Sequence, residues 1–136
     1  MFIFSLLFHF VSYDIWFYIS HVVLHNKFSS IHNIHHKTPH DKLKWYNVTD
    51  GHILEHLIQP LGLFFPFLFY VDIPAFCIVG LIISIRGYMR HDERFSFIVG
   101  NHHLLHHKYP KCNFSEYYVD YLFGTLHENI ENTNER

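Results

Sequence analysis

Histidine is the residue whose spacing most constrains this chain. Residues 101–110 read Asn-His-His-Leu-Leu-His-His-Lys-Tyr-Pro, and within them His103, His106 and His107 follow the pattern His-x-x-His-His. On a helix, residues three and four positions apart share a face. We therefore expect the three rings to project from one face and to converge on a single point, as metal ligands do.

Two further histidine clusters occur earlier in the chain. His32, His35 and His36 repeat the His-x-x-His-His pattern, and His21 and His25 form a looser pair four residues apart. The clusters lie where apolar segments meet basic, polar ones, and a histidine-rich solvated tract would show no such correlation. The sequence therefore predicts that distant segments meet at one shared site.

The number of candidate ligands indicates two metal ions. A structural zinc site takes four protein ligands and a catalytic zinc site three, so the imidazoles of three clusters overfill one metal and suit two neighbouring ones. Imidazole binds iron, zinc and copper alike. A pair of iron ions at a membrane surface has an obvious use, which is to activate dioxygen against inert C–H bonds. We expect two iron ions and O2, with zinc an alternative occupant in a purified protein.

Apolar segments frame the histidine clusters. Residues 2–24 contain no Lys or Arg, and Asp14 is their only formally charged side chain, so this stretch can span a bilayer as a helix. Residues 52–89 form a second apolar region, in which Asp72 and Pro74 mark the tip of a helical hairpin. Each hairpin arm has about 15–19 residues, or roughly 22–28 Å of α-helix, against a hydrocarbon core of about 30 Å. We expect arms that are short or tilted.

The basic residues lie on one side of this arrangement, in segments 27–50, 86–94 and 108–136. By the positive-inside rule, the histidine clusters then face the cytosol. The predicted fold is all-α: an N-terminal membrane span and an apolar helical hairpin that carry a cytosol-facing, histidine-rich di-metal site. We expect one domain over residues 1–126, followed by an acidic, disordered tail over residues 127–136.

Charge and cysteine content exclude other classes. The formal net charge is −2 and the sequence pI is about 6.7, and no nucleic-acid-binding motif is present, so nucleic acid is not an expected partner. Cys77 and Cys112 have no paired spacing and predict no disulfide framework. That fits a reducing, cytosol-facing site.

One motif supports a different enzyme class. His52-Ile53-Leu54-Glu55-His56 matches His-x-x-Glu-His, in which an inverted zinc protease uses two histidines as ligands and the glutamate as general base. Such a protease has no use for the other clusters, which makes it the less favoured alternative. We expect Glu55 and His56 near the metal site, as orienting groups or extra ligands.

Taken in order, these motifs resemble those of the fatty acid hydroxylase/sterol desaturase superfamily, integral membrane di-iron enzymes defined by ordered histidine boxes. The resemblance runs from about Val11 to Leu126. The matching residues are Asp14, Phe17, Tyr18, His21 and His25; then His32, His35 and His36; then His52 to Glu55, with Ile53 in place of the family's proline; then His91 within Met89-Arg90-His91-Asp92; then His103, His106 and His107; and finally Asn113-Phe114 and Asp120-Tyr121-Leu122-Phe123-Gly124-Thr125.

The resemblance adds His91 to the ligands that spacing predicts. The expected metal ligands are His21, His25, His32, His35, His36, His91, His103, His106 and His107. A second set could bind the metals or orient their ligands, namely His52, Glu55, His56 and His102. His102 directly precedes His103, so its side chain points roughly 100° away on a helix, which favours a supporting role.

The resemblance implies an O2-dependent oxidoreductase that hydroxylates or desaturates an acyl chain or a sterol in the endoplasmic reticulum or a similar membrane. Family members take electrons from cytochrome b5 and its reductase. Because the chain has no haem-binding His-Pro-Gly-Gly element, we expect a separate protein as electron donor.

The chain departs from the family pattern in two respects. Val22 stands where an arginine usually follows the first histidine, and the chain begins almost at the first box, without the preceding helices common in the family. A rival interpretation follows, in which the chain is a shortened, catalytically inactive relative that binds metal or partners in the membrane.

Overall fold

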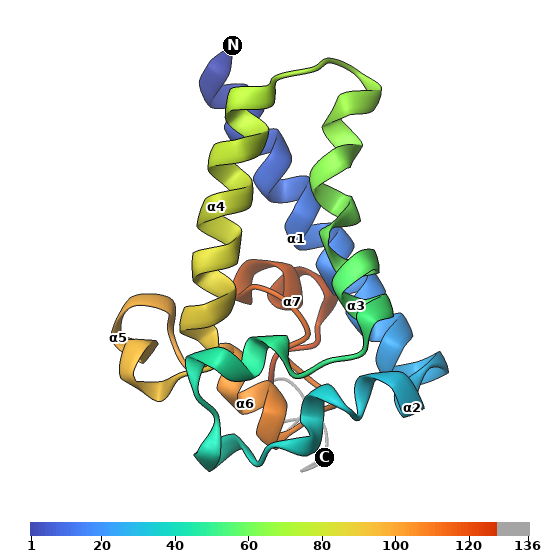
Figure 1. The fold of residues 1–136 in the computed structure, drawn as a ribbon, viewed down its shortest axis with the longest axis vertical. Helices are drawn as coiled ribbons and strands as arrows, with labels where there is room; N and C mark the ends of the chain where they lie inside the picture. Colours follow the sequence, from blue (N-terminus) through green and yellow to red (C-terminus); the bar gives the residue numbers. More distant parts are fainter. Residues whose placement is uncertain (128–136) are drawn as a thin grey trace.

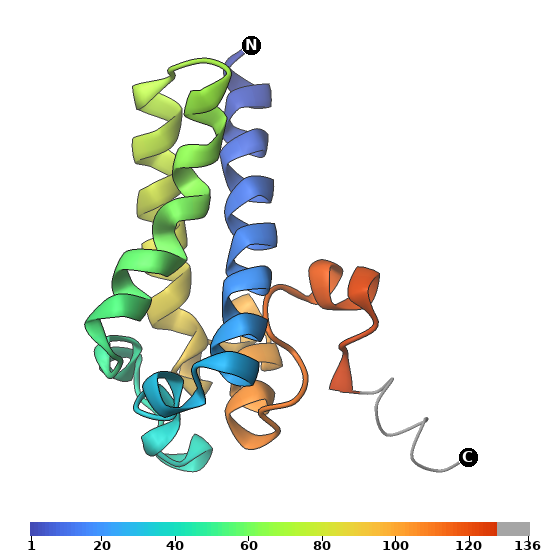
Figure 2. The same cartoon turned by 90° about the vertical axis from the view of Figure 1, so that its right-hand side faces the viewer.

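Three apolar arms lie side by side, and short helices close one end of them (Figures 1 and 2). This arrangement comes from a computed structural model that describes residues 1–127. All regular secondary structure in those residues is helical. The N-terminus and the hairpin tip lie at the opposite end from the short helices (Figure 1). The all-α class and the expected order of apolar segments are confirmed.

The first arm, α1 (Phe2–Lys27), buries polar side chains and exposes apolar ones. Its buried residues include Ser5, His9 and Asp14, whereas Leu7 and Ile19 are among its exposed ones. A helix on the surface of a protein in water shows the reverse pattern. The outward apolar face of α1 therefore suits a lipid environment.

The other two arms form the predicted hairpin. The first consists of α3 (Ile53–Ile58) and the 3₁₀ helix η4 (Gln59–Leu68), and the second is α4 (Ile73–Arg90). The carboxylate of Asp72 accepts a hydrogen bond of 3.1 Å from the backbone N–H of Ala75. This cap begins α4 and places the tip where the sequence predicts it.

The arm made of α3 and η4 is longer than α-helical geometry suggests. Pro60 and Pro66 have no N–H to donate, and η4 continues as a 3₁₀ helix for 10 residues. A 3₁₀ helix rises about 2.0 Å per residue instead of 1.5 Å, which gives this arm a length of about 29 Å and α4 about 27 Å. Both lengths are close to the thickness of a hydrocarbon core, about 30 Å. The hairpin arms are therefore only slightly shorter than the core.

Helices α1 and α4 are each long and apolar enough to cross a membrane. Together with the exposed apolar face of α1, they indicate that the protein associates with a membrane. The segment Ile53–Leu68 is a shorter apolar helix.

The backbones of α1 and η4 approach each other closely at Gly62. A Cβ atom on Gly62 would lie 2.5 Å from Cβ of Trp16 and 2.9 Å from both the carbonyl oxygen of Ser12 and Cα of Tyr13. The indole N–H of Trp16 also donates to the carbonyl of Ile58 at 2.7 Å. Glycine is required here because no side chain fits between the two arms.

A partly buried network of charges joins α1 to α4. The guanidinium of Arg86 contacts both carboxylate oxygens of Asp14, and the hydroxyl of Tyr118 donates to the same carboxylate at 2.8 Å. Glu116 contacts Arg86 at 3.2 Å and also pairs with Arg90. The one charged side chain predicted within the first span is therefore neutralised by a partner from another arm.

The polar segments form short helices at the end of the arms. These are α2 (Ser29–His32), η1 (His35–Lys37), η2 (His40–Lys42), η3 (Trp45–Thr49), η5 (Glu93–Phe95), α5 (Ser96–Val99), α6 (His102–Lys108) and α7 (Tyr117–Phe123). The first His-x-x-His-His motif is divided between α2 and η1 instead of lying on one helix. Thr38 is extended because it precedes Pro39, and η1 ends there. Of the predicted acidic tail, all but His127 lies outside the described residues.

Candidate metal centre

The predicted ligands gather in two groups at the closed end of the arms. The first group is His21, His25, His32, His36 and His106, and the second group is His35, His91, His103 and His107. Within each group, the potential ligand atoms all lie within 4.8 Å of one another. Every histidine expected as a metal ligand falls in one group or the other. That they bind metal stays a prediction.

Each His-x-x-His-His motif is divided between the two groups. In α6, His106 belongs to the first group, whereas His103 and His107 belong to the second. Adjacent residues on a helix point about 100° apart, so His106 and His107 cannot reach the same point. The expected convergence of this motif on a single point is therefore wrong. Through the adjacent residues His106 and His107, one helix contributes to both groups. The earlier motif is divided in the same way, with His35 in the second group and His36 in the first.

In the first group, the Nε2 atoms of the rings face one another. The Nε2–Nε2 distances are 2.9 Å for His21 and His32, 3.0 Å for His25 and His106, 3.1 Å for His32 and His36, and 3.2 Å for His36 and His106. Two nitrogens that each lie about 2.1 Å from one ion, at a right angle, are about 3.0 Å apart. The spacing therefore fits a single ion among the rings.

The opposite ring nitrogen, Nδ1, of three of these histidines meets an oxygen atom. His21 Nδ1 contacts the carbonyl of Phe114, His106 Nδ1 lies 2.6 Å from the carbonyl of Cys112, and His32 Nδ1 lies 2.9 Å from the carboxylate of Glu55. A carbonyl or an ionised carboxylate only accepts hydrogen bonds, so Nδ1 carries the proton and Nε2 presents a lone pair.

The second group repeats this arrangement in part. His35 Nδ1 donates to the carbonyl of Asp50 at 3.0 Å, and His91 Nδ1 donates to the carbonyl of Gly87 at 2.8 Å. The Nε2 atoms of His35 and His91 then face each other at 3.1 Å. Two lone pairs at that distance repel, with no proton to bridge them, and a cation between them removes the repulsion. Both groups therefore fit a metal ion.

Burial keeps the rings in the form that binds metals. Desolvation, reinforced by neighbouring histidines, lowers the pKa of His36 to about 2 and that of His91 to about 3. The pKa values of His103, His106 and His107 also lie below the ordinary value of 6.5, chiefly because these rings are buried. Neutral imidazole is the ligand form, so no proton has to leave before a metal binds.

Two of the four predicted supporting residues contact the site or its surroundings. Glu55 is buried and orients His32 through the contact described above. His102 lies outside both groups and contacts the carboxylate of Asp120 at 3.1 Å. Glu55 is placed to support a ligand, because carboxylates that hold ligand histidines tune metal sites. The supporting role of His102 stays a prediction.

The other two supporting residues, His52 and His56, lie outside both groups. His52 caps α3 by accepting a hydrogen bond from the backbone N–H of Leu54. His56 is exposed, and its Nε2 lies 3.3 Å from the carbonyl of Thr49. Within residues 1–127, neither belongs to a cluster of potential metal ligands. The arrangement therefore gives no support to the zinc-protease alternative.

Sequence reasoning missed the oxygen atoms that hold the rings. The carbonyls of Asp50, Gly87, Cys112 and Phe114 act through the backbone, which leaves no residue-type signal. The one residue-type signal nearby is Asn113, whose φ is 56°. Asparagine tolerates this left-handed conformation better than most residues do.

A cavity of about 80 Å³ lies beside the second group, lined by His35, His91 and His103 and by His21 of the first group. A groove of about 240 Å³ between η4 and α4 adjoins this cavity, and its walls include Leu63, Gly80 and Ile83. Both hollows share the wall residues Tyr13, Val48, His56, Gln59 and Gly87. The groove between the hairpin arms therefore lies next to the cavity beside the second group.

The fold and site define a membrane-associated helical protein with two histidine groups suited to holding metals. The family model described as Fatty acid hydroxylase matches residues 6–125, and the chain belongs to that family. This confirms the resemblance seen in the motifs. It is a family of di-iron hydroxylases and desaturases. Comparisons with curated proteins and with solved structures give no match.

Proposed function

We propose that this protein is an O2-dependent lipid oxidoreductase that hydroxylates or desaturates an acyl chain or a sterol, with two iron ions held by the two histidine groups. The observation that carries the proposal is the set of facing, unprotonated Nε2 atoms in both groups. Family membership supports the choice of iron and of a lipid substrate.

The residues around the cavity position the substrate. Leu63 and Ile83 line the adjoining groove, where they favour an apolar chain and exclude water. His35, His91 and His103 line the inner cavity, so the reacting carbon lies beside the second group. The iron pair, when bound, supplies the oxidising power that removes hydrogen from an unactivated C–H bond.

The reaction requires electrons from outside the chain. Hydroxylation consumes O2, two electrons and two protons, and yields the alcohol and one water molecule. Desaturation consumes the same reactants and yields the alkene and two water molecules. A separate donor such as cytochrome b5 with its reductase supplies the electrons. Basic residues near the histidine groups, such as Lys37 and Lys42, favour a cytosolic orientation, and we assign the endoplasmic reticulum as the membrane.

Metal and lipid analysis test the proposal together. The purified chain should hold about two metal ions, and cells that express it with reductase and oxygen supplied should gain an oxidised lipid. The His106→Ala variant should lose that product. His40→Ala is the matched control, since His40 lies in η2 outside both groups, and it should keep the product. Metal without product would favour the inactive-relative interpretation, and a chain without metal would refute the proposal.

A further inference from the structure

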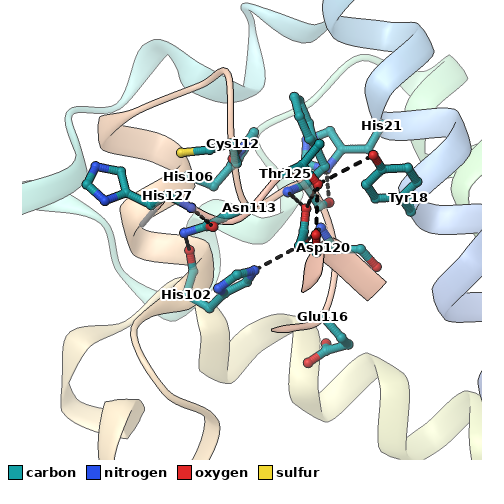
Figure 3. A network of polar contacts seen from close by, with 12 residues as sticks. Tyr18, His21, His102, His106, Cys112, Asn113, Glu116, Asp120, Thr125 and His127 are labelled. Atoms are coloured by element: carbon teal, nitrogen blue, oxygen red, sulfur yellow. Dashed lines mark hydrogen bonds and ion pairs between the residues drawn. The ribbon is translucent and has the colours of Figure 1, made fainter. Parts of the chain in front are cut away.

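We propose that Asp120 is a positioning residue for the first group, because it fixes the loop whose carbonyl oxygens orient His21 and His106. This inference rests on the proposed function only in requiring that the group bind a metal. Asp120 touches no member of either group directly. It lies in α7, and Figure 3 shows its side chain directed toward His102 of α6 and toward Thr125.

The loop between α6 and α7 serves two ligands at once. Its Cys112 carbonyl accepts the Nδ1–H of His106, and its Phe114 carbonyl accepts that of His21. The first ring comes from α6 and the second from α1, the N-terminal arm. A shift of this one loop would therefore release two rings of the first group together.

The carboxylate of Asp120 accepts hydrogen bonds from four donors, two of which belong to the loop, and its side chain is fully buried, at 0% exposure. One oxygen accepts from the backbone N–H of Phe114 at 2.8 Å and from the hydroxyl of Thr125 at 2.6 Å. The other accepts from the backbone N–H of Ser115 at 2.7 Å and from Nε2 of His102 at 3.1 Å. Each oxygen therefore accepts two hydrogen bonds, which uses the acceptor capacity of the carboxylate.

The loop depends on these contacts because it has no regular structure of its own. Residues 113–116 lie between α6 and α7 and belong to no helix. Asn113, which begins this stretch, donates its backbone N–H to the carbonyl of Thr125 at 2.9 Å, and Thr125 donates its own N–H to the carbonyl of Asp120 at the same distance. Asp120 therefore lies at the centre of the contacts that set the positions of both ring-binding carbonyls.

An Asp120→Asn substitution tests this role with a minimal change in shape. The amide has a single acceptor oxygen, so in either orientation its NH2 group faces the backbone N–H of Phe114 or of Ser115. A buried N–H without an acceptor is unfavourable, and the loop has to move. Loss of a partner that orients a ligand histidine typically lowers metal affinity about 10–100-fold.

The second group provides the internal control. Its anchored rings donate to the carbonyls of Asp50 and Gly87, which belong to other segments of the chain. A loosened loop should therefore weaken the first group selectively, whereas general loss of the fold would weaken both. Zinc binding by each group has to be measured with the other group disabled. His91→Ala/His107→Ala disables the second group, and His25→Ala/His32→Ala/His36→Ala disables the first.

The experiment measures zinc affinity of the full-length chain in detergent, with and without Asp120→Asn, in each of these two backgrounds. We expect the dissociation constant to rise about 10–100-fold where only the first group remains and to change less than about threefold where only the second remains. Equal loss in both backgrounds, or loss in neither, would overturn the positioning role.

Two substitutions of Thr125 give a milder test in case Asp120→Asn does not fold. Thr125→Val removes one donor to the carboxylate, whereas Thr125→Ser keeps it. The first should weaken the first group alone, and the second should leave both groups as they are; the reverse result would contradict the inference. A wild-type chain that binds zinc in both groups but forms no lipid product would refute the proposed function while these binding results still decide the role of Asp120.

Discussion

The two histidine groups consist of the same residue type but are held in different ways. In the first group, His21, His32 and His106 each have Nδ1 fixed by an oxygen atom. In the second, Nδ1 of His103 and both ring nitrogens of His107 are buried without a hydrogen-bond partner in the part of the chain that the structure describes. Three of the five rings of the first group are therefore fixed before a metal binds, whereas the tautomer and orientation of His103 and His107 in the second group are not set by hydrogen bonds.

The looser group is also the one beside the cavity. Three of the rings that line the cavity belong to the second group, and only His21 comes from the first. Of these three rings, His35 and His91 are anchored through Nδ1, whereas Nδ1 of His103 has no partner among the described residues. The ring that can adjust to oxygen and substrate at the cavity is therefore His103. Hydrogen bonds outside the ligand set can therefore distinguish two sites that are made of one ligand type.

The largest difference between the groups should appear on metal removal. With anchored rings, the first group should bind its ion about 10–100-fold more tightly than the second, since fixed tautomers reduce the ordering needed on binding. Dialysis against increasing chelator should then release the metal of the second group first, in two separate steps. Release in one step, or in the opposite order in variants with a single group, would break the comparison.

Filling the groove should affect the second group's function without affecting metal binding. A Cβ on Gly80 would meet only Leu63, at 4.0 Å, so there is room for a larger side chain. Gly80→Leu should fill the groove and reduce product about tenfold, the scale of excluding a chain from an apolar pocket, with metal content unchanged. Gly80→Ala is the matched control and should retain most of the product. Metal loss in the leucine variant would show that the groove and the second group are not separable.

The smallest expected effect concerns Glu55, which anchors a ring of the first group only. Glu55→Gln keeps an acceptor oxygen but loses the charge that strengthens the contact with His32, and zinc affinity of the first group should fall less than about tenfold. His56→Ala is the control, because this exposed neighbour lies outside both groups. An equal fall in the second group would contradict the assignment, as would any metal loss from His56→Ala.

Sequence patterns predicted the parts of the fold that composition controls. The apolar run over residues 2–24 became α1, which continues to Lys27, and the polar step at Asp72 became the hairpin tip. The 3₁₀ helix η4 was not predicted, because an apolar run does not distinguish an α-helix from a 3₁₀ helix. Only the positions of Pro60 and Pro66 signalled that geometry.

Which histidines form the site was easier to predict than how they are divided between the two groups. Histidine spacing brought the correct segments together, but treating each motif as one face overlooked the divergence of adjacent rings such as His106 and His107. The role of Asp120 left no readable signal either, although the residue lies in a matched motif. Two of its four partners are backbone N–H groups, whose proximity depends on the tertiary fold.

The pairing of Asp14 with Arg86 has a consequence for biosynthesis. The two residues are separated by 72 positions, so α1 leaves the ribosome long before its countercharge exists. A lone aspartate near the middle of a membrane helix opposes insertion by about 2.5–3.5 kcal/mol. The nascent α1 should therefore settle in the bilayer only once α4 has been translated, so that a helix made well before α4 reaches its final depth together with it.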